Sequence, residues 1–225
     1  MTLVLAIDCA VSGLAAALVR DGEVLGLRHE EGREQAARLL PVIASLFADA
    51  GIDRRALSMI AVTIGPGSFT GVRVGLAAAR GLAVALDIPL AGIPTTTALL
   101  AQAPKGSRLA VAAIDSQLGD WFCALAAQDH KPFLATAALL AGRLRDQASL
   151  VIGPQATSLA NELVAAGVDV EARMALPDPI TLAQLAVAEG VDVWSARNRT
   201  EGLPRPLYLR GVNITLPDGR RRTVD

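Results

Sequence analysis

The sequence predicts an α/β fold built from two similar halves in tandem. An apolar run of strand length that ends in a carboxylate occurs twice, at Leu3–Asp8 and at Leu109–Asp115. Each run is followed by a turn, further strand-length apolar runs and segments with helical spacing. Between the halves lies Ala103-Pro104-Lys105-Gly106, and such punctuation is typical of a boundary. We therefore expect one unit at 1–103 and a second at 104–225, with the last segment returning to the first.

The first half reads β-β-β-α-β-α-β-α. Apolar runs between turn residues predict its strands, and apolar residues at helical spacing predict its helices. Gly51 is a suitable residue to end the first helix, and Pro41 inside it is expected to kink it or to end a first turn. The expected strands are Leu3–Asp8, Leu14–Arg20, Val24–Arg28, Met59–Ile64 and Pro89–Ile93, and the helices are Arg33–Ala50, Thr70–Leu86 and one that begins near Thr95.

The second half repeats this order with shorter segments. Its expected strands are Leu109–Asp115, Trp121–Gln128, a third after His130-Lys131-Pro132, and Leu150–Gly153, and its helices are Thr136–Gln147, Gln155–Ala166 and Ile180–Glu189. Two β-β-β-α halves in tandem are the plan of actin-like ATPases and sugar kinases. The predicted class is therefore a duplicated actin-like ATPase/sugar-kinase (ASKHA) fold with an abbreviated second half.

Composition excludes several classes of protein. The chain has 225 residues, of which 52% are hydrophobic and 3% aromatic, so Ala, Leu, Val and Ile must form the core. A formal net charge of −1 argues against an intrinsic nucleic-acid or membrane surface. Cys9 and Cys123 lie in apolar runs, which fits a reducing cytoplasm. No signal peptide or long charge-free run is present, and His29 and His130 do not make a zinc pattern.

The segment Gly65–Thr70 joins a buried strand to an apolar helix. Gly65-Pro66-Gly67 must turn sharply, and Ser68 or Thr70 can cap the helix that follows. A glycine loop at a helix N-terminus is a candidate anion site, although no Walker Gly-Lys-Ser/Thr follows here. A plain strand–helix turn is the alternative.

The helix after this loop is apolar on nearly all sides. Beyond Thr70 its only polar side chains are Arg73 and Arg80. A helix of this kind is expected to be covered nearly all round. We expect one side to face the sheet and a stripe of small residues to face a second helix, which can belong to a partner chain. The stripe side comprises Gly71, Gly75, Ala78, Ala79 and Leu82.

Several stretches carry a family resemblance. Gly65–Arg73 reads GPGSFTGVR, and a strand ending in a Gly-Ile-Pro-Thr turn follows at Pro89–Thr95. Arg33–Pro41 reads REQAARLLP, and the closing stretch Leu203–Val212 contains Pro-Leu-Tyr-Leu-Arg. These features resemble the TsaB (YeaZ-type) family, a subunit of the bacterial tRNA threonylcarbamoyladenosine machinery. The resemblance spans most of the chain.

The resemblance implies a non-catalytic platform subunit in the cytoplasm. Such a subunit pairs with the TsaD catalytic subunit, which transfers threonylcarbamoyl to the adenosine next to the anticodon of ANN-decoding tRNAs. The TsaE ATPase joins that pair, and tRNA is contacted only through the complex. Alone, the chain is expected to form a homodimer. The expected partner interface comprises Leu39, Leu40, Ile43, Gly71, Arg73, Gly75, Ala78, Ala79 and Leu82. The alternative is that the chain's own second half buries both helices.

Departures from the family pattern weaken any ATP or metal site. In the actin-like fold, Asp8 stands where a strand-end aspartate helps to hold the metal, and the alternative is that it caps its own turn. Cys9-Ala10 replaces a Thr-Ser pair that is more common in relatives, and Gln35 replaces a histidine. We therefore expect no cofactor on this chain alone and ATP or ADP only at a subunit interface. The candidate nucleotide wall comprises Asp8, Gly65, Gly67, Ser68 and Thr70.

Other activities have less support in the sequence. An actin-like small-molecule kinase or ATPase is the main alternative, and an inactive metallopeptidase relative is a third. No Ser/His/Asp or Cys/His constellation is evident, so no catalytic residue is assigned. The hairpin Asp115–Trp121 keeps only Asp115, Gly119 and an acidic Asp120 of the family pattern. The basic Arg220–Arg222 tail is interpreted as solvated.

Overall fold

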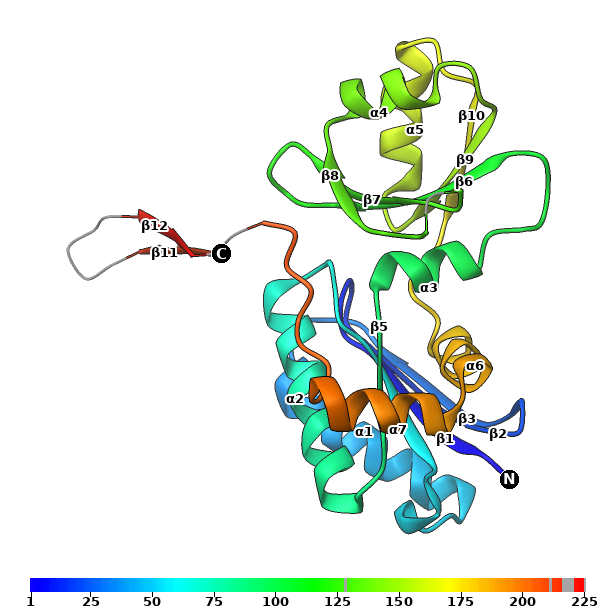
Figure 1. Cartoon of the computed structure of the whole chain (residues 1–225), viewed down its shortest axis with the longest axis vertical. Coiled ribbons are helices and arrows are strands. Elements are labelled where there is room, and N and C mark those ends of the chain that lie inside the picture. The colour runs from blue at the N-terminus through cyan, green and yellow to red at the C-terminus, as the bar shows by residue number, and fades with distance from the viewer. Residues whose placement is uncertain (128, 211, 216–220, 225) are drawn as a thin grey trace.

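The computed structural model describes residues 1–127, 129–210, 212–215 and 221–224, the last two ranges as backbone only (Figure 1). Gln128, at the end of one expected strand, and Arg220, in the basic tail, lie outside the described residues. The described residues form two five-stranded mixed sheets. We call the part built on strands β1–β5 the first lobe and the part built on strands β6–β10 the second lobe. Strands β11 (Val212–Thr215) and β12 (Arg221–Val224) pair separately.

The two large sheets have the same topology. The first runs β3-β2-β1-β4-β5 and the second runs β8-β7-β6-β9-β10. In each sheet the first three strands are antiparallel, and the last two lie parallel to the central strand. The predicted duplicated α/β fold is therefore confirmed. The strands are β1 Leu3–Asp8, β2 Leu14–Arg20, β3 Glu23–Glu30, β4 Met59–Thr63, β5 Leu90–Ile93, β6 Leu109–Asp115, β7 Trp121–Leu125, β8 Phe133–Ala135, β9 Ser149–Gly153 and β10 Val170–Met174.

The second half is abbreviated in the length of its elements rather than in their number. Helix α1 (Gln35–Ala50) has 16 residues, whereas its counterpart α4 (Ala137–Leu144) has 8. Helix α2 (Phe69–Leu86) has 18 residues, and its counterpart α5 (Ala156–Ala165) has 10. The fifth strand, β10, was not expected from the sequence, because Glu171 and Arg173 interrupt its apolar pattern.

Both faces of the first sheet are covered by helices. Helices α1 and α2 cover one face, with the short helix η1 (Arg54–Ala56) near the end of α1. Helices α6 (Pro179–Glu189) and α7 (Val191–Glu201) pack on the other side, so the chain returns to the first lobe after β10. Helix α3 (Thr95–Ala101) lies between the lobes (Figure 1) and packs on the second sheet.

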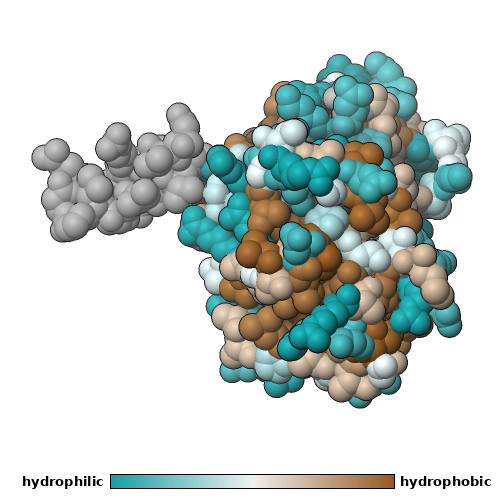
Figure 2. All heavy atoms as spheres, turned by 60° about the horizontal axis from the view of Figure 1, so that its bottom comes forward, coloured by the Kyte–Doolittle hydropathy of each residue, from teal (hydrophilic) through white to brown (hydrophobic). Residues whose placement is uncertain are grey.

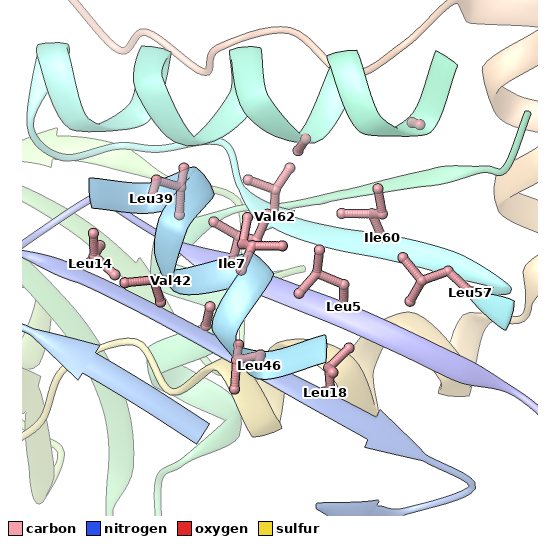
Figure 3. Close-up of a cluster of buried hydrophobic side chains, with 14 of the residues drawn as sticks. Leu5, Ile7, Leu14, Leu18, Leu39, Val42, Leu46, Leu57, Ile60 and Val62 are labelled. Atoms are coloured by element: carbon pink, nitrogen blue, oxygen red, sulfur yellow. The ribbon is translucent and has the colours of Figure 1, made fainter. Parts of the chain in front are cut away.

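The core of the first lobe lies between the sheet and the helices α1 and α2. Figure 3 shows that the labelled side chains of α1 point toward those of β1 and β4 beneath α2. The aliphatic composition predicted such a core, because branched side chains fill the space without large rings. The labelled core residues are Leu5, Ile7, Leu14, Leu18, Leu39, Val42, Leu46, Leu57, Ile60 and Val62.

The first turn of α2 rests directly on the turn between β1 and β2. Ser68 caps the helix, as predicted, by accepting a hydrogen bond from the Gly71 amide at 3.2 Å. A Cβ on Gly71 would overlap the carbonyl oxygen of Cys9, and one on Gly75 would lie 3.4 Å from the Cys9 Cβ. The small residues therefore allow the helix backbone to approach the sheet.

This packing corrects one expectation. The stripe Gly71, Gly75 and Ala79 was predicted to face a second helix or a partner chain, but all three residues are buried against the chain's own sheet. Helical spacing identifies which residues share a side, yet it does not say whether that side faces a helix or a strand. Here Cys9, in the turn between β1 and β2, occupies the space beside Gly71 and Gly75.

A pair of glycine substitutions within α2 tests this contact. Gly71→Ala should destabilise the protein by about 2–3 kcal/mol, because the new methyl group meets backbone that cannot move away. Gly81→Ala is the control, because its Cβ would meet nothing within 4 Å. It should stabilise the helix by about 1 kcal/mol. Urea unfolding measures both values, and equal effects of the two substitutions would contradict the close contact.

Candidate functional site

A cleft of about 840 Å³ lies between the two lobes. Its walls come from the β1–β2 turn, the start of α2 and the β6–β7 hairpin of the second lobe. Arg33 is the only cation among the residues that line it, and Asp115 is the only anion. The lining comprises Ala10, Val11, Ser12, Gly13, Gly32, Arg33, Gln35, Gly67, Ser68, Phe69, Thr70, Ile114, Asp115, Ser116, Gln117, Phe122 and Gln155.

The β1–β2 turn is closed by the chain itself. The Ser68 amide donates a hydrogen bond to the Ala10 carbonyl oxygen at 2.6 Å, and a Cβ on Gly67 would overlap that same oxygen. The Gly71 amide is already bonded to the Ser68 hydroxyl. Amide groups that bind a phosphate must be free to point at it. The amides of Ser68 and Gly71 are therefore already used by the fold.

The Asp8 side chain faces inward and does not reach the cleft. Asp8 is only 3% exposed. Its Oδ1 accepts a hydrogen bond from the Thr63 hydroxyl at 2.6 Å. The Ala10 amide donates to the same oxygen at 3.1 Å. Burial raises the pKa of this carboxyl to about 6, although both hydrogen bonds and the nearby His29 lower it. Asp8 caps its own turn, as the alternative interpretation held, and it is not among the residues that line the cleft.

The other candidate wall residues divide into two groups. Gly67, Ser68 and Thr70 line the cleft. Gly65 does not, because its carbonyl accepts a bond from the Thr95 amide and its Cα faces the backbone of Leu207. Asp8 is therefore not placed to hold a metal ion in this cleft, and the Ser68 and Gly71 amides are not free for a phosphate. Among the described residues, no cluster of three or more His, Cys, Asp or Glu is placed to hold a metal ion.

A second hollow, of about 520 Å³, lies between α1 and α2 on the outside of the first lobe. We call it the α1–α2 groove. Leu40 is 54% exposed at its edge, and Leu82 and Leu86 on α2 are half-buried there. Figure 2 looks toward this end of the molecule and shows apolar residues gathered on it. The groove is lined by Leu40, Ile43, Ala44, Phe47, Ile52, Asp53, Arg54, Arg55, Leu57, Leu82 and Leu86.

Three of the expected interface residues lie in this groove. Leu40 and Leu82 are accessible there, and Ile43 forms part of its buried floor. Leu39 is buried in the core, as are the small residues of the stripe, so none of these four residues can contact a partner. Ala78 is half-buried against the same core.

Arg73 lies at the other end of α2, under the closing segment of the chain. Its guanidinium stacks 3.6 Å from the centre of the Phe69 ring, and its Nε donates to the Tyr208 hydroxyl at 2.8 Å. Arg73 is thus engaged within the chain. No spacing in the sequence pointed to this contact, because Arg73 and Tyr208 are far apart along the chain.

The closing segment Leu203–Arg210 crosses from the first lobe to the second. Arg80 donates to the Leu203 carbonyl at 3.1 Å, and the Leu207 amide donates to the Ile64 carbonyl at 2.7 Å. At its end, Arg210 forms an ion pair with Asp120 of the second lobe. The segment therefore ties the β6–β7 hairpin to the first lobe. The sequence singled it out only through the family resemblance.

Helix α2 is also long and apolar enough to cross a membrane, by length and composition alone. A core helix of a folded domain passes the same test. Only 33% of this helix is buried; its buried side packs on β1 and β4, and Leu82 and Leu86 on its outer side line the α1–α2 groove.

Comparison with known proteins decides the family. A model of the TsaD family, described as tRNA N6-adenosine threonylcarbamoyltransferase, matches residues 29–195. The chain belongs to the TsaD family. Within it, the chain is of the TsaB (YeaZ) type, as the sequence features at Gly65–Arg73 and Leu203–Val212 indicated.

Three relatives illustrate the similarity. The tRNA threonylcarbamoyladenosine biosynthesis protein TsaB of Escherichia coli K12 is 36% identical over 123 residues, 54% of this chain and 53% of that protein. TsaB of Bacillus subtilis 168 is 32% identical over 124 residues, 54% of either chain. The matches thus span about half the length of the curated relatives. A solved Pseudomonas aeruginosa protein, described as similar to peptidase YeaZ, aligns with a TM-score of 0.72 and 26% identity, covering 93% of this chain and all of that one.

The buried Asp8 carboxyl predicts a specific pH dependence. The pKa of Asp8 is about 6 in the folded protein and 3.8 is its ordinary value, so the folded state binds this proton more tightly than the unfolded state does. Protonation of Asp8 therefore stabilises the fold. This group's contribution to the unfolding free energy therefore falls as the pH rises from about 4 to about 6, by up to about 3 kcal/mol, and is constant above. Asp8→Asn should remove that change. Urea unfolding of the parent and of Asp8→Asn at pH 4.5 and pH 7 measures this change. If the two proteins differ in unfolding free energy by the same amount at both pH values, this account of Asp8 is contradicted.

Proposed function

We propose that this chain is a non-catalytic platform subunit in tRNA threonylcarbamoyladenosine biosynthesis. It pairs through the α1–α2 groove with the TsaD catalytic subunit, which modifies the adenosine next to the anticodon of ANN-decoding tRNAs, and the pair is joined by the TsaE ATPase. The observation that carries this proposal is the exposed apolar groove, on a chain whose β1–β2 turn is closed by its own helix. The names of the TsaB relatives support the biosynthetic role.

The groove has the properties of a helix-docking surface. Helix α2 has 18 residues, so it is about 27 Å long, and α1 lies beside it with 16. Two helices of this length can present the roughly 800 Å² that a stable interface buries on each partner. Leu40, Leu82 and Leu86 supply apolar contacts, and Arg54 and Arg55 supply a polar margin.

The same surface explains the expected self-association. An exposed apolar patch tends to be covered, and in the absence of the catalytic subunit a second copy of this chain offers the matching helices. The homodimer and the pair with TsaD are therefore mutually exclusive in this proposal. A face that serves both partners must be free in the isolated monomer, and the 54% exposure of Leu40 agrees with this.

The chemistry of the cleft supports a non-catalytic role. Asp8 is buried and bonded to Thr63, and Gln35, at the cleft margin, stands where the family has a histidine. Nucleotide enters the proposal only at a boundary between subunits, where a partner supplies the phosphate-binding groups. Transfer RNA is reached through the complex, in keeping with a net charge of −1. The buried, unpaired thiols of Cys9 and Cys123 support a cytoplasmic location.

An actin-like kinase or ATPase is the alternative that the interlobe cleft favours, because its size can admit a small molecule. Incubation of the isolated chain with ATP and Mg²⁺ separates the two functions. We expect no ADP release above a blank, and turnover by the chain alone that Asp115→Asn abolishes would establish the alternative.

A substitution in the groove tests the interface directly. Leu40→Asp places a charge on the exposed margin and should weaken binding to the TsaD subunit at least tenfold, since the carboxylate loses its water on docking. Val164→Asp is the matched control, because Val164 is 57% exposed on α5 of the second lobe. Both variants should unfold at the same temperature as the parent. Isothermal titration calorimetry measures binding, and unchanged affinity in Leu40→Asp would place the interface elsewhere.

A further inference from the structure

Strand β10 is an open edge of the second sheet. Among the described residues it pairs only with β9, so one side of its backbone has no strand neighbour. Val170 is half-buried, and the four residues that follow it are exposed, with Met174 exposed to 70%. An edge of this kind is a template for pairing with another strand.

The hydrogen bonds show which residues face the open side. The Asp169 carbonyl accepts from the Ser149 amide at 2.9 Å, and the Ala175 amide donates to the Gly153 carbonyl at 3.1 Å. Successive residues of a strand point their backbone groups to opposite sides, so the odd-numbered residues of β10 are bonded to β9. The amides and carbonyls of Val170, Ala172 and Met174 therefore point to the open edge.

The side chains along this edge are complementary to a second copy of themselves. The strand reads Val-Glu-Ala-Arg-Met, with Ala172 at its centre. When two such strands run antiparallel about a two-fold axis at Ala172, Glu171 lies opposite Arg173 of the second copy. Val170 lies opposite Met174 of the second copy in the same arrangement. Opposite charges and apolar pairs directly across two strands stabilise their pairing.

We propose that β10 pairs antiparallel with β10 of a second copy of this chain, joining the two second-lobe sheets into one continuous sheet. The three outward-facing residues of each strand form hydrogen-bonded pairs, which gives about six backbone bonds across the axis. Glu171 and Arg173 then occupy the intervening positions, where the strands are closest. Arg108 already holds one oxygen of Glu171, through its Nε at 2.9 Å, and so fixes the direction of this carboxylate.

This contact is independent of the α1–α2 groove. The groove belongs to the first lobe and β10 to the second, at the opposite end of the molecule (Figure 1). Two copies joined at β10 can therefore each retain a partner on α1 and α2. The proposed function can fail without affecting this inference, and the reverse is also true.

Disulfide trapping tests the axis. In a hydrogen-bonded antiparallel pair the opposed Cα atoms lie about 5.5 Å apart, within reach of a disulfide. Ala172→Cys, made together with Leu40→Asp to remove association through the groove, should form a covalent dimer under mild oxidation by oxidised glutathione. The native Cys9 and Cys123 are buried and do not compete. Ala138→Cys, an exposed position on α4 of the same lobe, should remain monomeric on a non-reducing gel.

A charge reversal tests the complementarity. Arg173→Glu places two glutamates opposite each other, so it should slow cross-linking of the Ala172→Cys protein at least tenfold. Arg145→Glu, which makes the same change in net charge at an exposed site of the second lobe, should leave the rate unchanged. Circular dichroism verifies that each variant is folded. The proposal is overturned if Ala172→Cys gives no more dimer than Ala138→Cys, or if the two charge reversals have equal effects.

Discussion

The contact between the first turn of α2 and the β1–β2 turn determines much of this structure. Gly67 and Gly71 let the helix backbone approach the carbonyl oxygens of Ala10 and Cys9 so closely that no side chain can intervene. At the same helix start, the Ser68 amide donates to the Ala10 carbonyl and the Gly71 amide donates to the Ser68 hydroxyl, so these two amides are not free to bind an anion. This close contact therefore fixes the position of α2 and engages two of the amides at its start.

The same contact sets the character of the outer surface. Because the small residues of α2 face the sheet, larger ones such as Leu82, Val84 and Leu86 are left on the outside, where α1 adds Leu40. Helix α2 is therefore apolar on both sides for two separate reasons. Its inner side packs closely against the sheet, and its outer side lines the α1–α2 groove. The closing segment adds a third constraint, since Arg80 and Arg210 tie it to α2 and to the second lobe.

Most of the fold could be predicted from the sequence, because the inner strands of both sheets are largely buried apolar runs bounded by turn residues. The repeat of Leu3–Asp8 at Leu109–Asp115 gave the duplication, and helical spacing gave α1 and α2. Strand β10 was missed because an exposed edge has no apolar pattern, and α7 because it buries only Trp194. For the site, the predicted interface residues Leu40 and Leu82 line the α1–α2 groove, and their contact with a partner stays a prediction. The roles of Asp8 and the glycine stripe depended on which surface faces inward, which spacing alone does not determine.

Hydrogen–deuterium exchange of this chain, with and without the TsaD catalytic subunit, tests the central claim most directly. If the α1–α2 groove is the docking surface, slowed exchange should appear in peptides from Gln35–Ala50 and Phe69–Leu86. Peptides from the β6–β7 hairpin and from α5 should exchange at the same rate in both states. Protection confined to the interlobe cleft, or no change in the two helices on binding, would contradict the account.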